Sequence, residues 1–261
     1  GVPGAVAELT STVPYGDLDA LDRVLAGRPH AAVVLEPSGL DVPPTGYLEG
    51  VVELAHRHGA LAVFDEVIIG FRVAPGGARE RYGVQPDFSC YGKALGNGMP
   101  IAAVGGRWEV MAAFEEVFFS GTHGGEALSL AAAAAVLDRI AEVDPDGRTV
   151  LDGIEQLGTV LRDGMAAVAP GHRVRVTGEP QRAVVSFVGP EPLIDKSWVQ
   201  QCFARAGILF NGSMFVSASH TREDIDRTIA AFEHACQALR GDDPVGDLLE
   251  GDPVQPVFRA P

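Results

Sequence analysis

The sequence predicts an α/β fold, in which helices cover a mostly parallel sheet, followed by a smaller α+β domain. In the first half of the chain, short runs of purely apolar residues alternate with segments of helical spacing, as expected for parallel strands buried on both faces. Polar residues that could do chemistry directly follow two of these runs, where parallel sheets bind their ligands. The second half combines long helical segments with β-rich runs, which favours a separate α+β domain.

The first half contains four predicted strands and three predicted helices. The strands are the apolar runs Ala31–Leu35, Leu61–Phe64, Phe88–Tyr91 and Ile101–Val104. The helices have apolar residues at helical spacing and cover Leu18–Leu25, Tyr47–His58 and Trp108–Phe114. Asp17 is a suitable N-cap for the first helix, and Gly59 can end the second.

The second half is predicted to contain four helices and four short strands. The helices run from about Glu126 to Ile140, from Val150 to Val168, from Ser197 to Ala206 and from Thr221 to Leu239. The strands are Arg173–Val176, Ala183–Val188, Ile208–Phe210 and Met214–Ser217. Thr221 followed three residues later by Asp224 resembles a capping box and marks the start of the last helix.

Composition narrows the possible partners and location. The net charge of −15 argues against nucleic acid and anionic membranes as partners. The three cysteines are far apart and lack metal-ligand spacing, so we expect neither a metal site nor a disulfide, and a reducing cytoplasm is the default location. We also expect no membrane span and no signal peptide, because no apolar run is long enough and the first residues carry no basic segment.

Lys93 is the first candidate catalytic residue. Lysine and arginine together number 20, and only Lys93 and Lys196 are lysines. An unprotonated lysine amine is a nucleophile, whereas arginine stays protonated. Lys93 follows the strand Phe88–Tyr91 and is surrounded by glycines that let a ligand approach closely. A Schiff-base lysine and an ordinary loop lysine are both compatible with this local pattern.

Asp65 is the second candidate, because it ends the apolar run Leu61–Phe64. A strand of this shape also occurs as the Walker B strand of ATPases, but Gly92-Lys93 lacks the preceding glycine and the following hydroxyl residue of a Walker A loop. The alternative use of a lysine and an acid together is pyridoxal phosphate (PLP) chemistry, in which an acid holds the pyridine nitrogen protonated. Glu66 points to the other face of the strand, so we expect it to be structural.

Several motifs in order resemble one family, the class-III aminotransferases of PLP fold type I, and within it the glutamate-1-semialdehyde aminomutase branch. They are Phe64–Arg72, Gly83–Asp87, Gly92–Pro100, Gly121–Ala127 and His220–Asp226. The resemblance covers residues 1 to about 240. It implies a large cofactor-binding domain over residues 1–141, a small α+β domain over 142–240 and an extended tail over 241–261.

The resemblance also implies roles for four residues. Lys93 would form the Schiff base with PLP and move the substrate proton, and Asp65 would pair with the pyridine nitrogen. Val67 would pack on one face of the ring. Thr122 would donate its hydroxyl to the cofactor phosphate across the interface of a homodimer.

Departures from the family pattern leave the reaction open. The chain begins about where the middle of the family's large domain would be, so the main phosphate-binding loop would come from a further segment or chain. The stretch Phe210–Phe215 lacks the gating glutamate of the aminomutase branch, and no arginine lies between Gly207 and His220 to hold a substrate carboxylate. Ile68 replaces a glutamine of some branches.

The predicted function is that of a PLP-dependent aminotransferase, which moves an amino group between an amine or amino acid donor and a carbonyl acceptor through Lys93. The alternatives are an aminomutase that moves the amine within one substrate and a catalytically silent fragment that needs a partner chain. The substrates themselves are not predicted.

Overall fold

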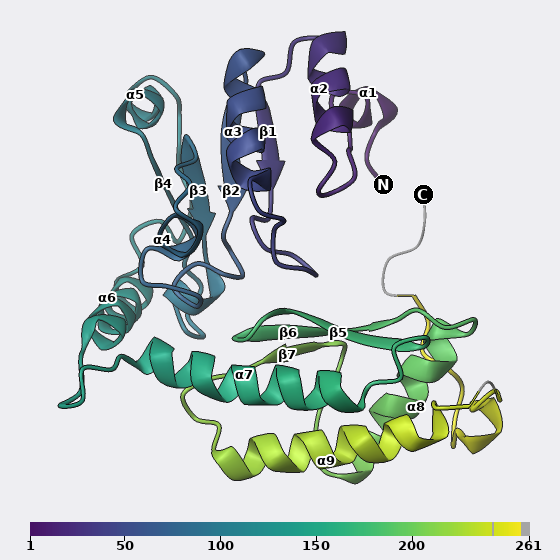
Figure 1. The fold of residues 1–261 in the computed structure, drawn as a ribbon. Coiled ribbons are helices and arrows are strands. Elements are labelled where there is room, and N and C mark those ends of the chain that lie inside the picture. Colours follow the sequence, from purple (N-terminus) through teal and green to yellow (C-terminus); the bar gives the residue numbers. More distant parts are fainter. Residues whose placement is uncertain (242, 257–261) are drawn as a thin grey trace. The chain divides into compact units, whose positions relative to one another are not determined.

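The computed structural model describes residues 1–241 and 243–256, and its chain divides into two units (Figure 1). The first unit contains Gly1–Gly39 and Pro43–Ala141, and the second contains Leu40–Val42 together with the chain from Glu142 onward. Among the described residues, no helix is long and apolar enough to cross a membrane.

The first unit is built on a four-stranded sheet with the order β1-β2-β3-β4. Its strands are β1 (Ala32–Leu35), β2 (Leu61–Asp65), β3 (Phe88–Tyr91) and β4 (Ala103–Gly106). The first three strands are parallel, and β4 runs antiparallel to β3. The prediction of a mostly parallel sheet is therefore confirmed. The fourth strand begins two residues later than its apolar run, because Ala103 is the residue that pairs with Tyr91.

Helices and short 3-10 turns connect and flank these strands. They are α1 (Gly4–Ala7), α2 (Leu18–Gly27), α3 (Tyr47–Arg57), α4 (Gly77–Tyr82), η1 (Lys93–Leu95), α5 (Trp108–Met111), η2 (Ala112–Glu115) and α6 (Ala127–Ala141). The Asp17 carboxylate accepts the Ala20 N–H and caps α2 as predicted. The sequence did not predict α4, because a short helix that starts at Gly76-Gly77 carries no periodic apolar signal.

The hydrophobic core of the first unit lies between α2, α3 and the sheet. Leu21 and Leu25 of α2 and Leu48 and Val51 of α3 are buried with Phe64 of β2. These residues recur every three or four positions along the helices, so each helix presents one apolar stripe. This packing supports strand β2, which carries Asp65 at its end.

The second unit combines an antiparallel sheet with three long helices (Figure 1). Its strands, in the order β5-β6-β7, are β5 (Val174–Glu179), β6 (Arg182–Phe187) and β7 (Ser213–Phe215), and its helices are α7 (Val150–Val168), α8 (Pro192–Arg205) and α9 (Arg222–Ala238). The predicted strand Ile208–Phe210 is wrong, since these residues belong to no strand. Helix α8 starts earlier than predicted because Pro192 is well suited to a first helical turn.

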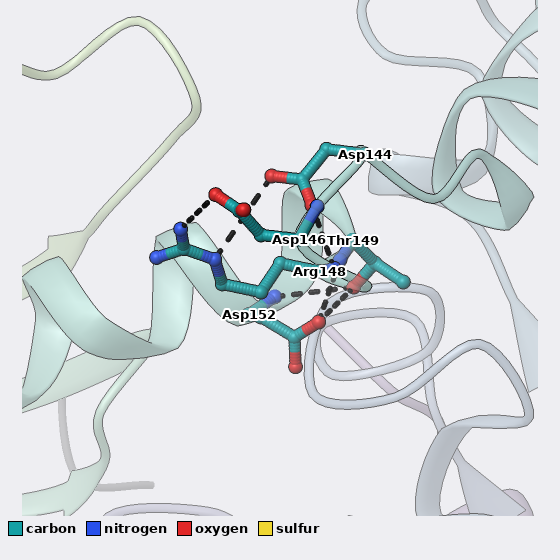
Figure 2. Close-up of polar contacts among 5 residues, drawn as sticks. All are labelled: Asp144, Asp146, Arg148, Thr149 and Asp152. Carbon is teal, nitrogen blue, oxygen red and sulfur yellow. Dashed lines mark hydrogen bonds and ion pairs between the residues drawn. The ribbon is translucent and has the colours of Figure 1, made fainter.

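Side-chain caps fix where α7 and α9 begin. At α7 the Thr149 hydroxyl accepts the Asp152 N–H at 3.3 Å, while Asp152 Oδ2 accepts the Thr149 N–H at 2.6 Å (Figure 2). Arg148 donates to Asp146 in the same turn at 2.8 Å. Thr221 and Asp224 form the equivalent capping box at α9, as the sequence predicted. Such caps satisfy backbone N–H groups that a helix leaves unpaired at its start.

A buried ion pair holds the start of the C-terminal segment against the rest of the second unit. The Arg173 guanidinium donates to the Asp195 carboxylate and also to the Gly241 and Asp243 carbonyl oxygens, at 3.1 and 3.0 Å. Farther along, the Val254 N–H donates to Ser197 Oγ at 2.9 Å. The predicted tail, residues 241–261, includes residues 242 and 257–261, which lie outside the described residues.

Candidate active site

Asp65 and Lys93 lie at the carboxyl ends of two adjacent parallel strands. Asp65 is the last residue of β2 and stands opposite Cys90 of β3. Lys93 follows β3 by two residues. Adjacent strands lie about 4.8 Å apart, and three residues extend the chain by about 10 Å at most. The two side chains can therefore reach one small ligand at this edge of the sheet.

The Asp65 carboxylate is oriented by the backbone that follows it. Its Oδ1 accepts the Val67 N–H at 3.0 Å, and the residue is half-buried. Burial, and after it the negative charge of Asp65, raise the pKa of the neighbouring Cys90 thiol. Cys90 thus stays a neutral thiol beside the carboxylate. Sequence reasoning missed this neighbour, although the strand register places it directly opposite Asp65.

Lys93 occupies a strained backbone position at the start of the 3-10 turn η1. Its φ of 43° lies in the left-handed region, which costs a non-glycine residue energy. The turn holds it there, because the Lys93 carbonyl oxygen accepts the Gly96 and Asn97 N–H groups at 3.1 and 3.0 Å. The side chain is exposed. Strain of this kind occurs at functional sites, where surrounding contacts fix an unfavourable conformation.

Two other non-glycine residues of the described chain have a positive φ, and each lies in a loop that follows β2 or β3. Within the described residues they are Phe71, at 58° in the loop after β2, and Asn97, at 45° in the loop after β3. Together with Lys93 they are confined to the segments that follow the two strands carrying the candidate residues. The local strain therefore accumulates at one edge of the sheet.

Val67 and Thr122 differ in their surroundings: Val67 packs against the backbone, whereas Thr122 is exposed. Val67 packs against the chain just before Lys93, because a Cβ placed on Gly92 would lie 3.4 Å from Val67 Cγ1. Thr122 is exposed in a turn in which the Gly124 N–H donates to the Gly121 carbonyl oxygen at 3.0 Å. The structure thus places Asp65, Val67 and Lys93 after the ends of two paired strands, whereas Thr122 lies in an exposed turn.

Glu66 is a buried carboxyl group next to this edge. Its side chain is fully buried, and Oε2 accepts the Ala78 N–H at 2.6 Å. Among the described residues, no group lies within normal hydrogen-bonding geometry of Oε1. Burial raises the pKa of Glu66, against smaller lowering effects from the Ala78 N–H and from the Ser89 and Tyr91 hydroxyls that face it. The sequence showed that this side chain faces away from Asp65, but not that it is enclosed.

A second buried carboxylate, Asp87, lies at the opposite end of β3. Its Oδ2 accepts the Ala62 N–H at 2.7 Å and contacts His56 Nε2 at 2.8 Å. Its Oδ1 accepts a hydrogen bond from Arg107 at 2.8 Å. Both oxygens are used, and the group ties α3, β2 and the segment after β4 together. We assign Asp87 a structural role on these contacts.

The arrangement at the strand ends can bind a small planar ligand that has a basic nitrogen and an electrophilic carbon. A carboxylate fixed at one strand end can pair with a protonated nitrogen. An exposed amine on the next strand end can attack a carbonyl carbon, since an unprotonated lysine amine is a nucleophile. The branched side chain of Val67, which packs against Gly92, offers an apolar surface next to Lys93.

Comparison with known proteins identifies the family that this chain matches. The family model described as aminotransferase class-III matches residues 14–185. A glutamate-1-semialdehyde 2,1-aminomutase from Methanothrix thermoacetophila is 39% identical over 256 residues, which cover 89% of this chain and 58% of that protein. The chain thus spans a little over half the length of the curated relatives it matches.

Solved structures agree with the fold. An omega-transaminase from Sphaerobacter thermophilus superposes with a TM-score of 0.82 at 25% identity, over 92% of this chain and 60% of that one. The FumI protein of Sphingopyxis sp. MTA144, a structure with PLP, gives a TM-score of 0.76 at 28% identity, over 88% of this chain and 57% of that one. These likenesses confirm the prediction of PLP fold type I.

Proposed function

The chain belongs to the class-III aminotransferases, and on that premise we propose that it carries the Schiff-base lysine and ring-binding part of a PLP-dependent aminotransferase. The observation that supports this most directly is the placement of Asp65 and Lys93 at the ends of adjacent parallel strands. The reaction would move an amino group from an amine or amino acid donor to a carbonyl acceptor.

The residues at this edge fit pyridoxal phosphate. Asp65 supplies a carboxylate whose Oδ1 is already fixed by the Val67 N–H, so it can pair with a pyridine N–H without reorienting. Gly92 has no side chain, and Val67 packs against it, which leaves a smooth apolar surface next to Lys93. When bound, PLP acts as an electron sink that stabilises negative charge on the substrate carbon next to nitrogen.

Each residue then has a defined task. Lys93 would hold the cofactor through its amine, and once a substrate amine has displaced it, the free amine would carry a proton to and from the substrate carbon. Asp65 would hold the proton on the ring nitrogen and so keep the ring electron-poor. Val67 would pack on the ring through van der Waals contact. Thr122 would donate its hydroxyl to the phosphate.

Thr122 supports a homodimer as the working form. It lies in an exposed loop, and the segment just before it exposes several large apolar side chains: Trp108 at 72%, Val117 at 55%, Phe118 at 96% and Phe119 at 74%. Apolar patches of this kind mark interaction surfaces. A second copy that covers this patch would bring its Thr122 loop to the neighbouring site.

An aminomutase of the glutamate-1-semialdehyde type is the second candidate. Relatives of that name are among the most similar curated proteins, at 39% identity for the Methanothrix thermoacetophila protein. Against it stands the stretch Phe210–Phe215, which contains no acidic residue. The two reactions are distinguished by supplying a labelled amine donor and an external keto acid. An aminotransferase passes the label to the keto acid, whereas an aminomutase retains it within its own substrate.

A catalytically silent fragment is the third possibility, because the chain spans 58% of that relative. In this case the remaining part of the site, including a phosphate-binding loop, comes from another segment or chain.

We place the protein in the cytoplasm, which the free cysteines Cys90, Cys202 and Cys236 support.

The deciding experiment uses the fact that only Lys93 and Lys196 are lysines. The chain is saturated with PLP, reduced with borohydride and mapped by mass spectrometry, with Lys93→Ala and Lys196→Ala as a matched pair. We expect the label on Lys93, its loss in Lys93→Ala and its retention in Lys196→Ala. A label confined to Lys196 or the terminal amine contradicts the proposed role, and a colourless chain favours the silent fragment.

The role of Asp65 has its own test. Asp65→Asn keeps the size of the side chain but no longer stabilises a protonated ring nitrogen. We expect this variant to retain the borohydride-fixed label and to lose at least about 100-fold in the rate of transamination, a typical contribution of positioned proton chemistry. An unchanged rate would rule out the pairing of Asp65 with the ring.

A further inference from the structure

Glu66 and Val67, the two residues after Asp65, lie next to Tyr91 and Gly92, the two residues before Lys93. Val67 lies against Gly92, since a Cβ on Gly92 would be 3.4 Å from Val67 Cγ1. Glu66 lies next to Tyr91, since a Cβ on Gly70 would be 2.7 Å from Tyr91 Cδ1 and 3.3 Å from Glu66 Cβ. The chain that leads to Lys93 thus has both residues as neighbours.

The Glu66 carboxyl group also holds the loop that follows β2. Its Oε2 accepts the Ala78 N–H at 2.6 Å at the start of α4. The backbone on both sides is fixed as well, because the Glu66 N–H donates to the Cys90 carbonyl oxygen at 2.9 Å and the Gly70 N–H donates to the Glu66 carbonyl oxygen at 2.8 Å. Glu66 therefore joins β2, β3 and α4 through one residue.

The loop packs on Tyr91 from a second direction. The ring centroid of Phe71 lies 5.2 Å from that of Tyr91, at an interplanar angle of 47°. Phe71 adopts a φ of 58°, a strained conformation that needs support from its surroundings. Gly70 fits beneath, since a Cβ there would lie 2.7 Å from Tyr91 Cδ1. The loop over 66–78 thus packs closely against Tyr91 at the end of β3.

We propose that Glu66 is a positioning residue, whose buried carboxyl group locks the loop over 66–78 onto Tyr91 and thereby fixes Asp65 and Lys93 relative to each other. The consequence for the site follows along the backbone. A shift of Glu66 moves Val67, whose N–H orients Asp65 and whose side chain contacts Gly92. This inference rests on the proposed function for its effect on cofactor binding, but its effect on the loops does not.

The cost of this carboxyl group supports a specific role. Burying a carboxyl group is unfavourable unless its oxygens are paired, and Oε1 has no hydrogen bond within the described part of the chain. An apolar side chain could fill the same space without that cost, but it could not accept the Ala78 N–H. Burial also raises the pKa of Glu66 and favours its neutral form, while the Ala78 N–H and the hydroxyls of Ser89 and Tyr91 act in the opposite direction.

The test compares Glu66→Ala and Glu66→Gln with a matched control, Glu80→Ala. Glu80 also accepts a backbone N–H of the same loop, from Gly76 at 2.6 Å, but it is exposed. Glutamine keeps the length of the side chain and a carbonyl oxygen for the Ala78 N–H. Each variant is folded and loaded with PLP, and the dissociation constant and the visible absorption band are measured on the folded fraction.

We expect Glu66→Ala to weaken PLP binding at least tenfold and to shift the absorption band, while Glu66→Gln and Glu80→Ala stay within twofold of the parent chain. Unchanged affinity and spectrum in folded Glu66→Ala would overturn the proposal, since loss of stability alone does not alter the folded site. If Glu66→Ala does not fold, Glu66→Asp decides. It keeps the carboxyl group but shortens its reach, so a similar loss supports the proposal and parental affinity overturns it.

Hydrogen exchange separates this inference from the proposed function. The Leu95, Gly96 and Asn97 N–H groups bond within the turn that carries Lys93. We expect Glu66→Ala to raise their exchange rates at least tenfold without any cofactor, and Glu80→Ala to leave them unchanged. Faster exchange confined to Ala78 would overturn the link to Lys93. A parent chain that binds no PLP but shows the expected exchange would refute only the proposed function.

Discussion

Gly77→Ala is expected to be far more harmful than Gly83→Ala, although both glycines have a left-handed backbone beside α4. Gly77 has a φ of +62° and Gly83 a φ of +73°. A Cβ on Gly77 would overlap Glu66 Oε2, whereas a Cβ on Gly83 would meet no atom within 4 Å. The two substitutions therefore share the backbone strain and differ in the displacement of the buried carboxyl group.

The magnitudes follow from these two contributions. Left-handed backbone costs an alanine roughly 1–2 kcal/mol, and this is the whole cost expected for Gly83→Ala. Gly77→Ala also pushes Glu66 away from the Ala78 N–H, and an unsatisfied buried group costs about 1–3 kcal/mol more. The total for Gly77→Ala is about 2–5 kcal/mol. For a chain of this size, 1 kcal/mol corresponds to a change of about 2–4 °C in Tm.

Thermal unfolding followed by circular dichroism measures both variants, and PLP binding is measured below the transition. We expect a loss of a few degrees for Gly83→Ala with parental cofactor affinity. Gly77→Ala should lose about twice as much and bind PLP more weakly, because Glu66 is displaced from Tyr91. Equal losses in Tm for the two variants would show that the carboxyl group is not held as described, and the reasoning about Glu66 would fail with it.

Two further predictions concern stability elsewhere. Burial alone would raise the pKa of Asp87, but the Ala62 N–H and the contacts with His56 and Arg107 lower it overall. Its stabilising effect is therefore complete above the ordinary aspartate range, near 3.9, and is lost as the pH falls through the lower folded pKa. Asp87→Asn should therefore reduce the acid dependence of Tm. In α7, Gly158→Ala should lower the free energy of unfolding by about 1–3 kcal/mol, because its Cβ would overlap the Pro180 carbonyl oxygen. Gly153→Ala should raise it by up to about 1 kcal/mol, because the space around Gly153 is open and alanine favours a helix. Urea unfolding measures both changes.

The elements that the sequence predicted well are those with a strong local signal. The strand Phe88–Tyr91 and the helix Val150–Val168 have the predicted bounds. Both are continuous patterns with clear ends, an apolar run before Gly92-Lys93 and a helix after the cap Thr149. Ile208–Phe210 is apolar too, but Leu209 is 99% exposed and the segment has no partner strand. A short apolar run alone therefore does not define a strand.

The direction of β4 could not be read from its residues. An apolar run of four residues fits either direction, and the length of the connection between the two predicted strands, residues 92–100, was the available clue. It is too short for the crossover that a parallel strand needs, which usually takes a dozen or more residues. The strand accordingly runs antiparallel to β3, with Tyr91 opposite Ala103.

In the candidate site too, some features could be predicted from the sequence and others could not. Asp65 and Lys93 were predictable because strand ends in a parallel sheet meet at one edge, and this rule needs only the order of elements. The enclosure of Glu66 depends on Ala78, twelve residues away, and on the side chains of the next strand. A contact of that kind produces no periodic pattern in the sequence. The local signal is the pair Gly76-Gly77, in which Gly77 has a positive φ.

The neighbouring acids Asp65 and Glu66 lie at the same strand end but differ in their surroundings. Side chains at successive positions point to opposite faces, so a single step along the chain moves a carboxylate from an accessible edge to an enclosed pocket. Asp65 is half-buried and accepts the Val67 N–H, while Glu66 is fully buried and accepts the Ala78 N–H. Under the proposed function, the first carboxyl group would serve the reaction and the second the geometry of the reacting groups, and Val67 joins the two through its backbone and its side chain.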